Sequence, residues 1–172
     1  MTQEALAQGQ GLHTKAPARG FTLVEMMVVL AVIAILALIA MPNFQDRIVR
    51  EQVVEAVRWA DFVKKPVAAT WTMTQALPPD NAAASLPPAD RIVSNLVRAV
   101  SVEGGAIHIS FGNQANGAIQ GKTLTLRPAI VSDAPVVPLA WVCGQAATPD
   151  RMTAQGVNRT DIAPRFLPVN CR

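Results

Sequence analysis

Residue types that commonly build catalytic or nucleic-acid sites are scarce in this sequence of 172 residues. It has no tyrosine, aromatic residues make up 5% of it, and its only histidines are His13 and His108. The low aromatic content argues against a platform on which nucleic-acid bases stack. The histidines have no companion ligands at metal-binding spacing, and no serine, cysteine or carboxylate constellation indicates catalysis. We therefore expect a protein that is not an enzyme and that has no metal site and no cofactor.

The sequence also has no large excess of positive or negative residues. Lys and Arg number 15 against 12 Asp and Glu, which gives a formal net charge of +3. A DNA-binding domain usually gathers its basic side chains into a patch, whereas those after residue 90 are scattered along this chain. DNA is a possible partner that the sequence does not indicate.

The sequence does contain one long apolar run near its N-terminus, over residues 21–41. The only polar side chains in it are Thr22 and Glu25. As a helix the run would extend roughly 31 Å, about the thickness of the hydrocarbon core of a bilayer. Lys15 and Arg19 precede it and favour a cytoplasmic N-terminus. The run predicts a single membrane-spanning helix in which Glu25 needs a specific partner.

A secretory signal peptide also begins with positive charge, but its apolar core is shorter and ends at an A-x-A-like cleavage site. The alanines of residues 31–40 are spaced three apart, so no such site closes this run. A simple signal anchor is the alternative.

The chain after the run predicts a helix that continues past a proline. Pro42 lies too far inside the pattern for a first helical turn, and we expect it to kink the helix; a plain helix stop is the alternative. Apolar residues then recur at helical spacing up to about Lys65, which predicts an amphipathic helix. Pro66 predicts a second break, after which residues 67–75 add further turns.

Short segments with strand character follow an irregular connection over residues 76–90. Alternating apolar residues predict four antiparallel strands, over residues 97–103, 106–111, 122–127 and 139–143. Gly104-Gly105 predicts a tight hairpin turn between the first two. A long helix followed by these strands predicts an α+β fold, with the helix packed on a four-stranded antiparallel sheet.

The second of these segments alternates most clearly. We expect its three large apolar residues to face the core and His108 to face solvent. The first segment, residues 97–103, does not alternate consistently, so its facing is ambiguous. Pro128 should end the third segment.

The only two cysteines, Cys143 and Cys171, lie beyond the membrane run, on the side predicted to be extracytoplasmic. That location favours a disulfide, with two free buried thiols as the alternative. Closing this loop of about 30 residues would stabilise the fold by roughly 3–4 kcal/mol.

Residues 20–25 read G-F-T-L-V-E directly before the apolar helix, and they resemble the processing site of the type IV pilin superfamily. The resemblance implies that a prepilin peptidase cuts between Gly20 and Phe21 and that the same enzyme then methylates the new amino group of Phe21. Glu25 matches the glutamate that the family needs for methylation and assembly. It would pair with the Phe21 amine of the same subunit or, as the family favours, of an adjacent one.

The other end of the chain is most similar to type IVa pilins. Residues 141–144 read W-V-C-G and residues 167–172 read L-P-V-N-C-R. They resemble the strand and the ending that bound the disulfide-closed loop of that group. Type II secretion pseudopilins share the processed N-terminus but usually lack this loop. The group often has a tyrosine soon after the membrane segment, which this chain does not have.

The resemblance implies a pilin fold in four parts. Residues 1–20 are a leader peptide that is removed, and residues 21–42 are a transmembrane helix that becomes the filament core. Residues 43–75 continue it as an amphipathic helix. Residues 76–172 form a globular head with the disulfide-bounded loop 143–171.

The implied function is that of a structural subunit that polymerises with further copies into an extracellular type IV pilus. Such a fimbrium is a cell projection that supports adhesion, twitching motility or DNA uptake. The precursor would cross the bacterial inner membrane once, with its N-terminus in the cytoplasm. Its partners would be the prepilin peptidase/N-methyltransferase and the inner-membrane assembly machinery. The alternative is a minor pilin or a type II secretion pseudopilin that primes or tips a filament and possibly binds DNA.

Overall fold

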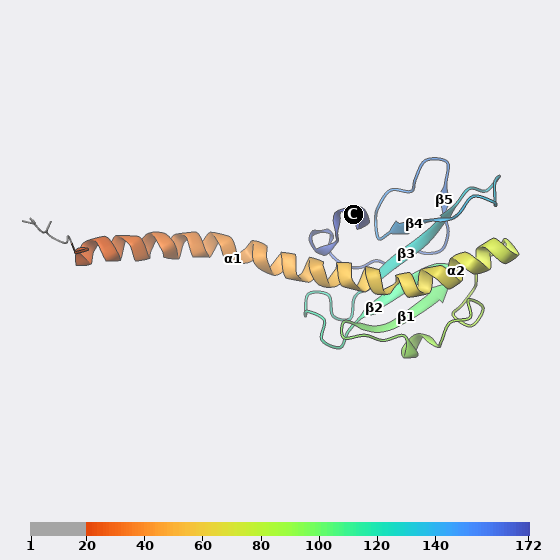
Figure 1. Ribbon diagram of the computed structural model, residues 1–172, viewed down its shortest axis with the longest axis horizontal. Helices are drawn as coiled ribbons and strands as arrows, with labels where there is room; N and C mark the ends of the chain where they lie inside the picture. The colour runs from red at the N-terminus through yellow and green to blue at the C-terminus, as the bar shows by residue number, and fades with distance from the viewer. Residues whose placement is uncertain (1–19) are drawn as a thin grey trace, which may run out of the picture. The chain divides into compact units, whose positions relative to one another are not determined.

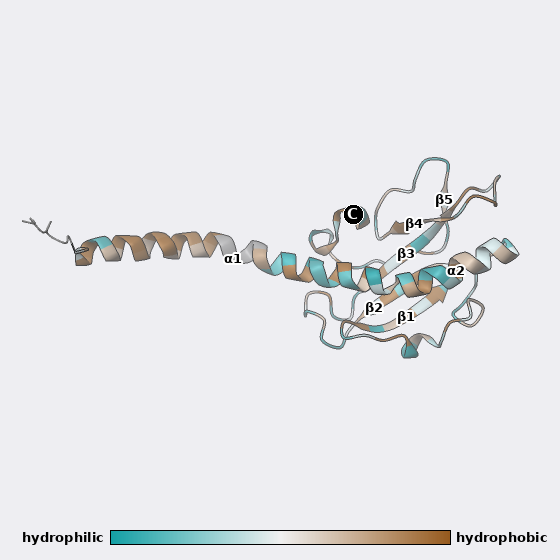
Figure 2. Cartoon of the chain, viewed as in Figure 1, coloured by the Kyte–Doolittle hydropathy of each residue, from teal (hydrophilic) through white to brown (hydrophobic). Residues whose placement is uncertain are grey.

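A computed structural model describes residues 20–172, without the side chains of residues 40–43. The chain divides into two compact units, one up to residue 40 and one from residue 41 onward. Helix α1 (Leu23–Trp59) begins in the first unit and ends in the second. Figure 2 shows its first turns in the brown of hydrophobic residues, and its later turns alternate between brown and teal.

In the second unit the helix has one buried face. After α1, a single non-helical residue, Ala60, precedes α2 (Asp61–Thr74). The buried residues recur at helical spacing: Val49, Val53, Ala56, Ala60, Val63, Val67 and Trp71. This pattern confirms the predicted amphipathic helix. Ile48, which the same periodicity would place beside Val49, is instead 40% exposed.

The predicted break at Pro66 is wrong. Pro66 lies inside α2, and the helix is interrupted earlier, at Ala60. Proline cannot donate a hydrogen bond to the carbonyl of Phe62, and its ring crowds that carbonyl. The irregularity falls in the preceding turn, where the carbonyl of Ala60 accepts hydrogen bonds from both Val63 at 2.9 Å and Lys64 at 3.0 Å.

Four strands form an antiparallel sheet in the order β1-β2-β3-β4 (Figure 1). Their bounds are β1 (Val97–Glu103), β2 (Ala106–Phe111), β3 (Thr123–Ile130) and β4 (Ala140–Cys143). A fifth strand of two residues, β5 (Thr153–Ala154), pairs with the end of β3. Short 3₁₀ helices are η1 (Ala89–Arg91), η2 (Pro164–Phe166) and η3 (Val169–Cys171). The α+β fold and its four-stranded antiparallel sheet are confirmed.

The first two strands are joined by the predicted hairpin. Gly104 and Gly105 have φ angles of +55° and +80°, and positive φ at both positions is characteristic of the type I′ turn that suits the twist of a hairpin. The turn is tight because neither residue has a side chain to clash in that conformation.

A bulge in β1 explains why its facing was ambiguous. Val97 pairs with Phe111 and Ala99 with Ser110, so Arg98 is one extra residue on β1. The bulge shifts the alternation by one residue. Val97 is buried together with Val100 and Val102, although simple alternation would separate Val97 from the other two.

Pro128 does not end β3, which continues to Ile130. The pairing of β3 with β2 extends only to Leu126. The carbonyl of Pro128 accepts the N–H of Gln155 at 2.8 Å, next to β5. In an antiparallel strand the nitrogen of a residue faces the same side as its carbonyl. The missing N–H of Pro128 therefore faces the segment of Gln155 and β5, and the ladders that β3 forms with β2 and β4 lose no bond.

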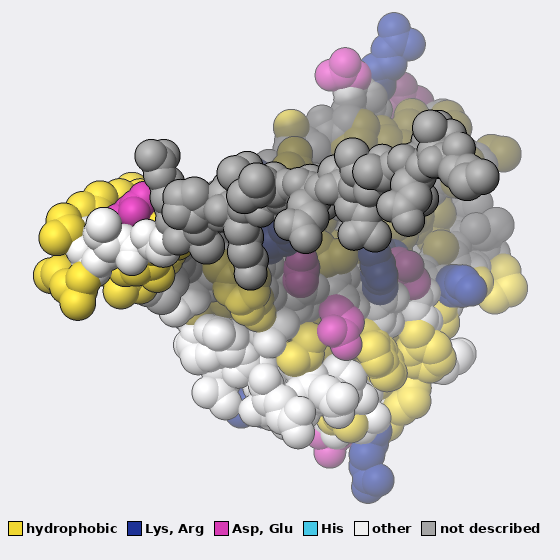
Figure 3. All heavy atoms as spheres, turned by 60° about the vertical axis from the view of Figure 1, so that its left-hand side comes forward, with side chains coloured by type: hydrophobic (Ala, Val, Ile, Leu, Met, Phe, Trp, Pro, Cys, Tyr) yellow, Lys and Arg dark blue, Asp and Glu magenta, His cyan; other side chains and the backbone are white. Residues whose placement is uncertain are grey.

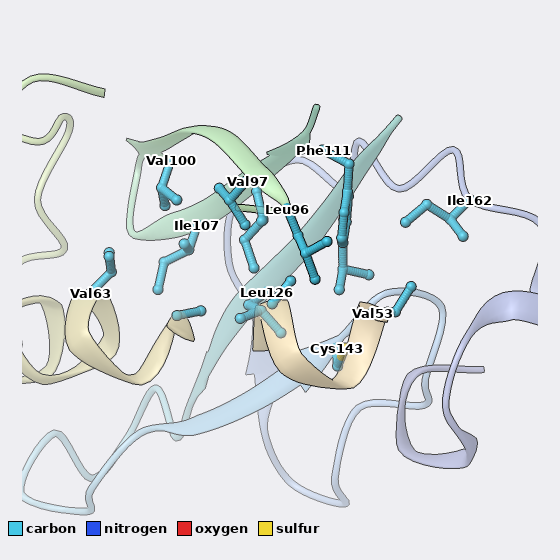
Figure 4. Close-up of a cluster of buried hydrophobic side chains, with 14 of the residues drawn as sticks. Val53, Val63, Leu96, Val97, Val100, Ile107, Phe111, Leu126, Cys143 and Ile162 are labelled. Atoms are coloured by element: carbon cyan, nitrogen blue, oxygen red, sulfur yellow. The ribbon is translucent and has the colours of Figure 1, made fainter. Parts of the chain in front are cut away.

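The core lies between the helix and the sheet. Figure 4 shows Val53 and Val63 from the helices directed toward Ile107, Phe111 and Leu126 of the sheet. All five side chains are at most 1% exposed. Burying a side chain of this size contributes roughly 1.5–3 kcal/mol, so packing on the sheet stabilises this amphipathic part of the helix more than its intrinsic propensity does.

Candidate assembly site and disulfide-closed tail

A reciprocal pair of hydrogen bonds closes the first turn of α1. The backbone N–H of Glu25 donates to Thr22 Oγ1 at 3.2 Å, and the backbone N–H of Thr22 donates to Glu25 Oε2 at 3.5 Å. The carbonyl of Thr22 accepts the first helical hydrogen bond, from Met26. This arrangement is a capping box. The T-L-V-E spacing is its signal in the sequence, from which only pairing with an amine was predicted for Glu25.

Gly20 and Phe21 lie just before this first turn, in exposed and non-helical chain. The side chain of Phe21 is 76% exposed. An exposed segment without regular hydrogen bonding is the kind of backbone that proteases cut. The rest of the predicted leader, residues 1–19 with His13, lies outside the described residues.

Among the described residues, the apolar part of α1 is exposed on every side. Its large hydrophobic residues from Leu23 to Ile39 are 43–77% exposed, and Figure 3 shows hydrophobic side chains gathered on this part of the helix. Within the described residues, one helical stretch, Leu23–Thr74, is long and apolar enough to cross a membrane by length and composition. So large an apolar surface needs lipid or other protein chains to cover it.

The helix does not stop at Pro42, because α1 continues to Trp59. This excludes a plain helix stop there. The side chain of Pro42 is not among those that the structure describes, and the predicted kink stays a prediction.

At the other end of the chain, Cys143 and Cys171 form the predicted disulfide. Cys143 ends β4, and both residues are buried. Next to the bond, Gly144 has a φ of +56°, and a β-carbon on it would lie 2.6 Å from the carbonyl oxygen of Cys171. The glycine of W-V-C-G is therefore required for the C-terminus to approach β4 this closely.

Inside the disulfide loop, a short segment is hydrogen-bonded to β3. We call residues 158–161 the tail strap. Thr123 N–H donates to Asp161 Oδ1 at 2.6 Å, and Thr125 N–H donates to Thr160 Oγ1 at 3.0 Å. These bonds satisfy backbone groups of β3 beyond its last pair with β4, which joins Leu126 to Cys143.

The tail strap also contains the sequence Asn158-Arg159-Thr160, which fits the pattern of a glycosylation sequon. Asn158 Nδ2 donates to the carbonyl of Gly144 at 2.8 Å. Because both the asparagine and the threonine side chains make hydrogen bonds within the fold, the structure gives this motif a structural role.

The prediction that His108 faces solvent is wrong. Its side chain is 3% exposed, because residues of the disulfide loop cover this face of β2. His108 Nδ1 lies 3.0 Å from Thr125 Oγ1, and Nε2 is buried with no partner among the described residues. Burial lowers the pKa of His108; the positive charge of Arg159 lowers it further, and the negative charge of Glu103 opposes them. This environment favours the neutral form of the histidine.

Arg159 also links the tail strap to the first strand of the sheet. Its Nη1 donates to Glu103 Oε1 at 2.7 Å, and both side chains are about half exposed. No group of three or more His, Cys, Asp or Glu side chains lies close enough together to hold a metal ion in residues 20–172.

These features define a class of protein. An N-terminal helix with apolar residues on every side needs a membrane or other subunits around it, whereas the second unit has a core and a disulfide of its own. That combination is typical of a subunit that is anchored or assembled through its first helix.

Comparison with known proteins gives the family. Residues 15–41 match the prokaryotic N-terminal methylation motif, and residues 49–172 match the pilin family of bacterial filaments. The type IV major pilin protein PilE of Neisseria gonorrhoeae is 36% identical over 160 residues, which cover 90% of this chain and 93% of that protein. The chain belongs to the pilin family, and it is a structural subunit of a bacterial filament.

Two further relatives cover the chain to a similar extent. A fimbrial protein of Neisseria meningitidis serogroup B is 31% identical over 163 residues, or 90% of this chain and 94% of that protein. The fimbrial protein EcpC of Eikenella corrodens is 34% identical over 158 residues, or 90% of each chain. The resemblance seen in the sequence is therefore confirmed at the level of the family.

Proposed function

We propose that this chain is the precursor of a major pilin, which polymerises into an extracellular type IV pilus. The observation that carries the proposal is the apolar part of α1, exposed on every side and preceded by G-F-T-L-V-E. Relatives named as type IV major pilin or fimbrial protein support it. The pilus serves adhesion, twitching motility or DNA uptake.

The precursor is cut between Gly20 and Phe21, and the new amino group of Phe21 is methylated. The match of residues 15–41 to the N-terminal methylation motif supports this step. The exposed, non-helical backbone at the cleavage position suits a peptidase. The enzyme that this chain would meet is a prepilin peptidase/N-methyltransferase.

Glu25 changes partner during assembly. Among residues 20–172 of the free chain, its carboxylate accepts one long hydrogen bond, from Thr22 N–H at 3.5 Å. Cleavage creates an ammonium at Phe21, and a carboxylate in apolar surroundings is stable only when a cation pairs with it. The ammonium of an adjacent subunit supplies that cation and fixes the stagger between neighbouring helices.

Before assembly, residues 21–42 span the inner membrane, with Lys15 and Arg19 on the cytoplasmic side. The inner-membrane assembly machinery then transfers them from lipid into the filament core, where other copies cover the same apolar surface. Residues 43–75 continue the helix, and the head, residues 76–172, forms the outer surface of the pilus. Pro42, at the junction, is a place where the helix can bend.

Intact mass of the subunit purified from sheared cell-surface filaments tests the proposal. We expect a chain that starts at Phe21, carries one additional methyl group, and is two hydrogens lighter than the reduced chain because of the Cys143–Cys171 bond. A major subunit should also dominate the sheared fraction. Assembled protein that retains residues 1–20 would overturn the processing step, and a trace abundance would indicate a minor subunit.

A further inference from the structure

Gly117 lies in the loop that joins β2 to β3 (Figure 1), at a position where the fold does not require a glycine. A β-carbon on it would meet no heavy atom within 4 Å apart from its chain neighbours, and its φ lies outside the left-handed region that favours glycine. The other glycines of residues 41–172 have a positive φ or a neighbouring side chain in the way: Gly104, Gly105, Gly112, Gly121, Gly144 and Gly156. Turn geometry and packing therefore do not explain Gly117.

The residue before this glycine is Asn116, and the two residues form a reactive pair. Among the asparagines of the sequence, Asn116 alone precedes a glycine. Both residues are exposed. Within the described residues, neither the N–H of Gly117 nor Nδ2 of Asn116 makes a hydrogen bond. The backbone nitrogen after an asparagine can attack the side-chain amide, and a glycine obstructs that approach least because it has no β-carbon.

Hydrogen bonds hold both the backbone and the side chain of Asn116. Its N–H donates to Gln52 Oε1 of α1 at 2.9 Å, and its carbonyl accepts the N–H groups of Ile119 and Gln120 at 2.9 Å each. Its Oδ1 accepts the N–H of Ala118 at 2.9 Å. Attack on the side-chain carbonyl would make that oxygen negative, and a donor already in place stabilises the charge. The turn thus holds the amide without occupying the nitrogen that would attack it.

We propose that Asn116-Gly117 is a self-modifying site, at which the asparagine becomes isoaspartate or aspartate without an enzyme. The nitrogen of Gly117 gives up its proton to hydroxide and attacks Asn116 Cγ. The new C–N bond closes a succinimide ring, and Nδ2 takes up a proton and leaves as ammonia. Water then opens the ring at either carbonyl and leaves a carboxylate. The inference goes beyond the proposed function and does not depend on polymerisation.

The main consequence concerns the anchoring of the loop to α1. Isoaspartate continues the chain through the former side chain, so the carbonyl that Ile119 and Gln120 donate to becomes part of a free carboxylate. The loop gains a negative charge and an additional backbone atom at the residue that Gln52 holds. We therefore expect the amides of Ile119 and Gln120 to exchange hydrogen faster in the modified chain.

Peptide mass spectrometry of the detergent-solubilised full-length protein tests the proposal. The folded protein is kept at neutral and at mildly alkaline pH, and samples are digested with trypsin at intervals. One tryptic peptide, residues 99–122, contains Asn116 and also Asn113, which is exposed too but precedes a glutamine. We expect progressive conversion of Asn116, faster at the higher pH because the attacking nitrogen must lose its proton, while Asn113 stays an amide. Equal conversion of both would overturn the proposal.

A urea-unfolded sample separates the effect of the fold from that of the sequence. Because the described turn leaves the attacking nitrogen free, we expect the folded chain to convert Asn116 within about tenfold of the rate of the unfolded chain at the same pH. A larger difference would show that the turn protects the amide, and the site would then not modify itself in the folded protein.

Gly117→Ala is the matched variant, because the fold has room for the methyl group. The methyl group hinders the approach of the backbone nitrogen to Asn116 Cγ, so we expect conversion to be at least about tenfold slower. The thermal midpoint should equal that of the wild type. Unchanged conversion in Gly117→Ala would contradict the succinimide route. A lowered thermal midpoint would show that the fold needs this glycine, and would remove the reason for assigning it to the reaction.

Discussion

Glu25 has two hydrogen-bonding roles that one substitution can separate. It caps the first turn of α1 in the free chain, and it is proposed to pair with an ammonium in the filament. Glutamine can replace glutamate in a capping box but offers no charge to an ammonium. We therefore expect Glu25→Gln to leave the helix start and membrane insertion intact and to prevent pilus formation. The measurement is the amount of subunit in the membrane and in the sheared surface fraction.

Thr22→Ala is the matched control for this prediction. It removes the hydroxyl that caps the helix, at a cost of about 0.5–2 kcal/mol of helix stability, and keeps the carboxylate. Pili should still form from Thr22→Ala. Normal pili from Glu25→Gln would show that the charge of Glu25 is not needed for assembly.

His108 makes the stability of the head depend on pH. In the unfolded chain it takes up a proton as the pH falls through about 6.5, whereas in the folded head burial holds its pKa lower. The unfolded state then binds more protons, so the free energy of unfolding falls as the pH falls through that range. We expect a loss of up to about 1.4 kcal/mol per pH unit between the unfolded and folded pKa values, measured by urea unfolding of the detergent-solubilised protein.

The variant His108→Asn removes the titrating group and serves as the reference for that pH dependence. Its stability should change less than that of the wild type between pH 7 and pH 5. Replacing Arg159 with methionine should weaken the effect, because the positive charge of Arg159 contributes to the lowered pKa of His108. Parallel pH profiles for the wild type and His108→Asn would contradict this account.

Among the elements of the fold, β1 lies at one edge of the sheet, and Asn81 from the preceding loop covers it. Asn81 Oδ1 accepts the N–H of Val102 at 2.6 Å, while its Nδ2 donates to the carbonyls of Val100 at 3.1 Å and Pro87 at 2.9 Å. The Asn81 side chain thus makes the two hydrogen bonds with β1 that the backbone of a neighbouring strand would make. Edge strands left open tend to pair with other chains.

Replacing Asn81 with alanine should therefore be costly. The change leaves the N–H of Val102 and the carbonyl of Val100 without their partner, and we expect a loss of about 2–4 kcal/mol in the free energy of unfolding. Chemical denaturation of the detergent-solubilised monomer measures it. Asn95→Ala, at an exposed position just before β1, should change stability by no more than about 0.5 kcal/mol. Equal midpoints for the two variants would show that Asn81 does not protect the edge.

The hydrogen bonds of Asn81 are an example of contacts that sequence patterns do not predict. The helices, the hairpin at Gly104-Gly105 and the disulfide follow from periodicity, turn chemistry and cysteine placement, which are local or compositional signals. The hydrogen bonds of Asn81 join residues about 20 apart, and no periodicity marks them. The bulge at Arg98 cannot be recognised in the sequence either, because it is defined by the pairing of β1 with β2.

The same limit applies to the candidate site. Gly20, Phe21 and Glu25 stand in one short motif that a single segment of sequence reveals. The cover over His108 comes from residues more than 40 positions further along, and alternation alone assigns its strand face to solvent because antiparallel sheets often expose that face. Only the path of the disulfide loop shows that the face is covered.

At the scale of the whole molecule, the disulfide joins the sheet to the C-terminus and encloses the tail strap. Cys171 is buried, and its carbonyl accepts the N–H of Gln145 at 3.0 Å. From the same tail, the carbonyl of Arg165 accepts a hydrogen bond from Arg50 Nη2 on α1 at 2.8 Å. The tail is therefore tied both to the sheet and to the helix.

Removing the disulfide should loosen this half of the head before the rest. We expect Cys143→Ala/Cys171→Ala to lower the free energy of unfolding by about 2–5 kcal/mol, measured by urea unfolding of the detergent-solubilised protein. Hydrogen exchange should quicken first at the amides of Thr123 and Thr125, which donate to the tail strap. The amides that join β1 to β2 should stay protected, because that hairpin has contacts of its own with the helix. Uniform loss of protection across the sheet would show instead that the head unfolds as one cooperative unit whether or not the loop is closed.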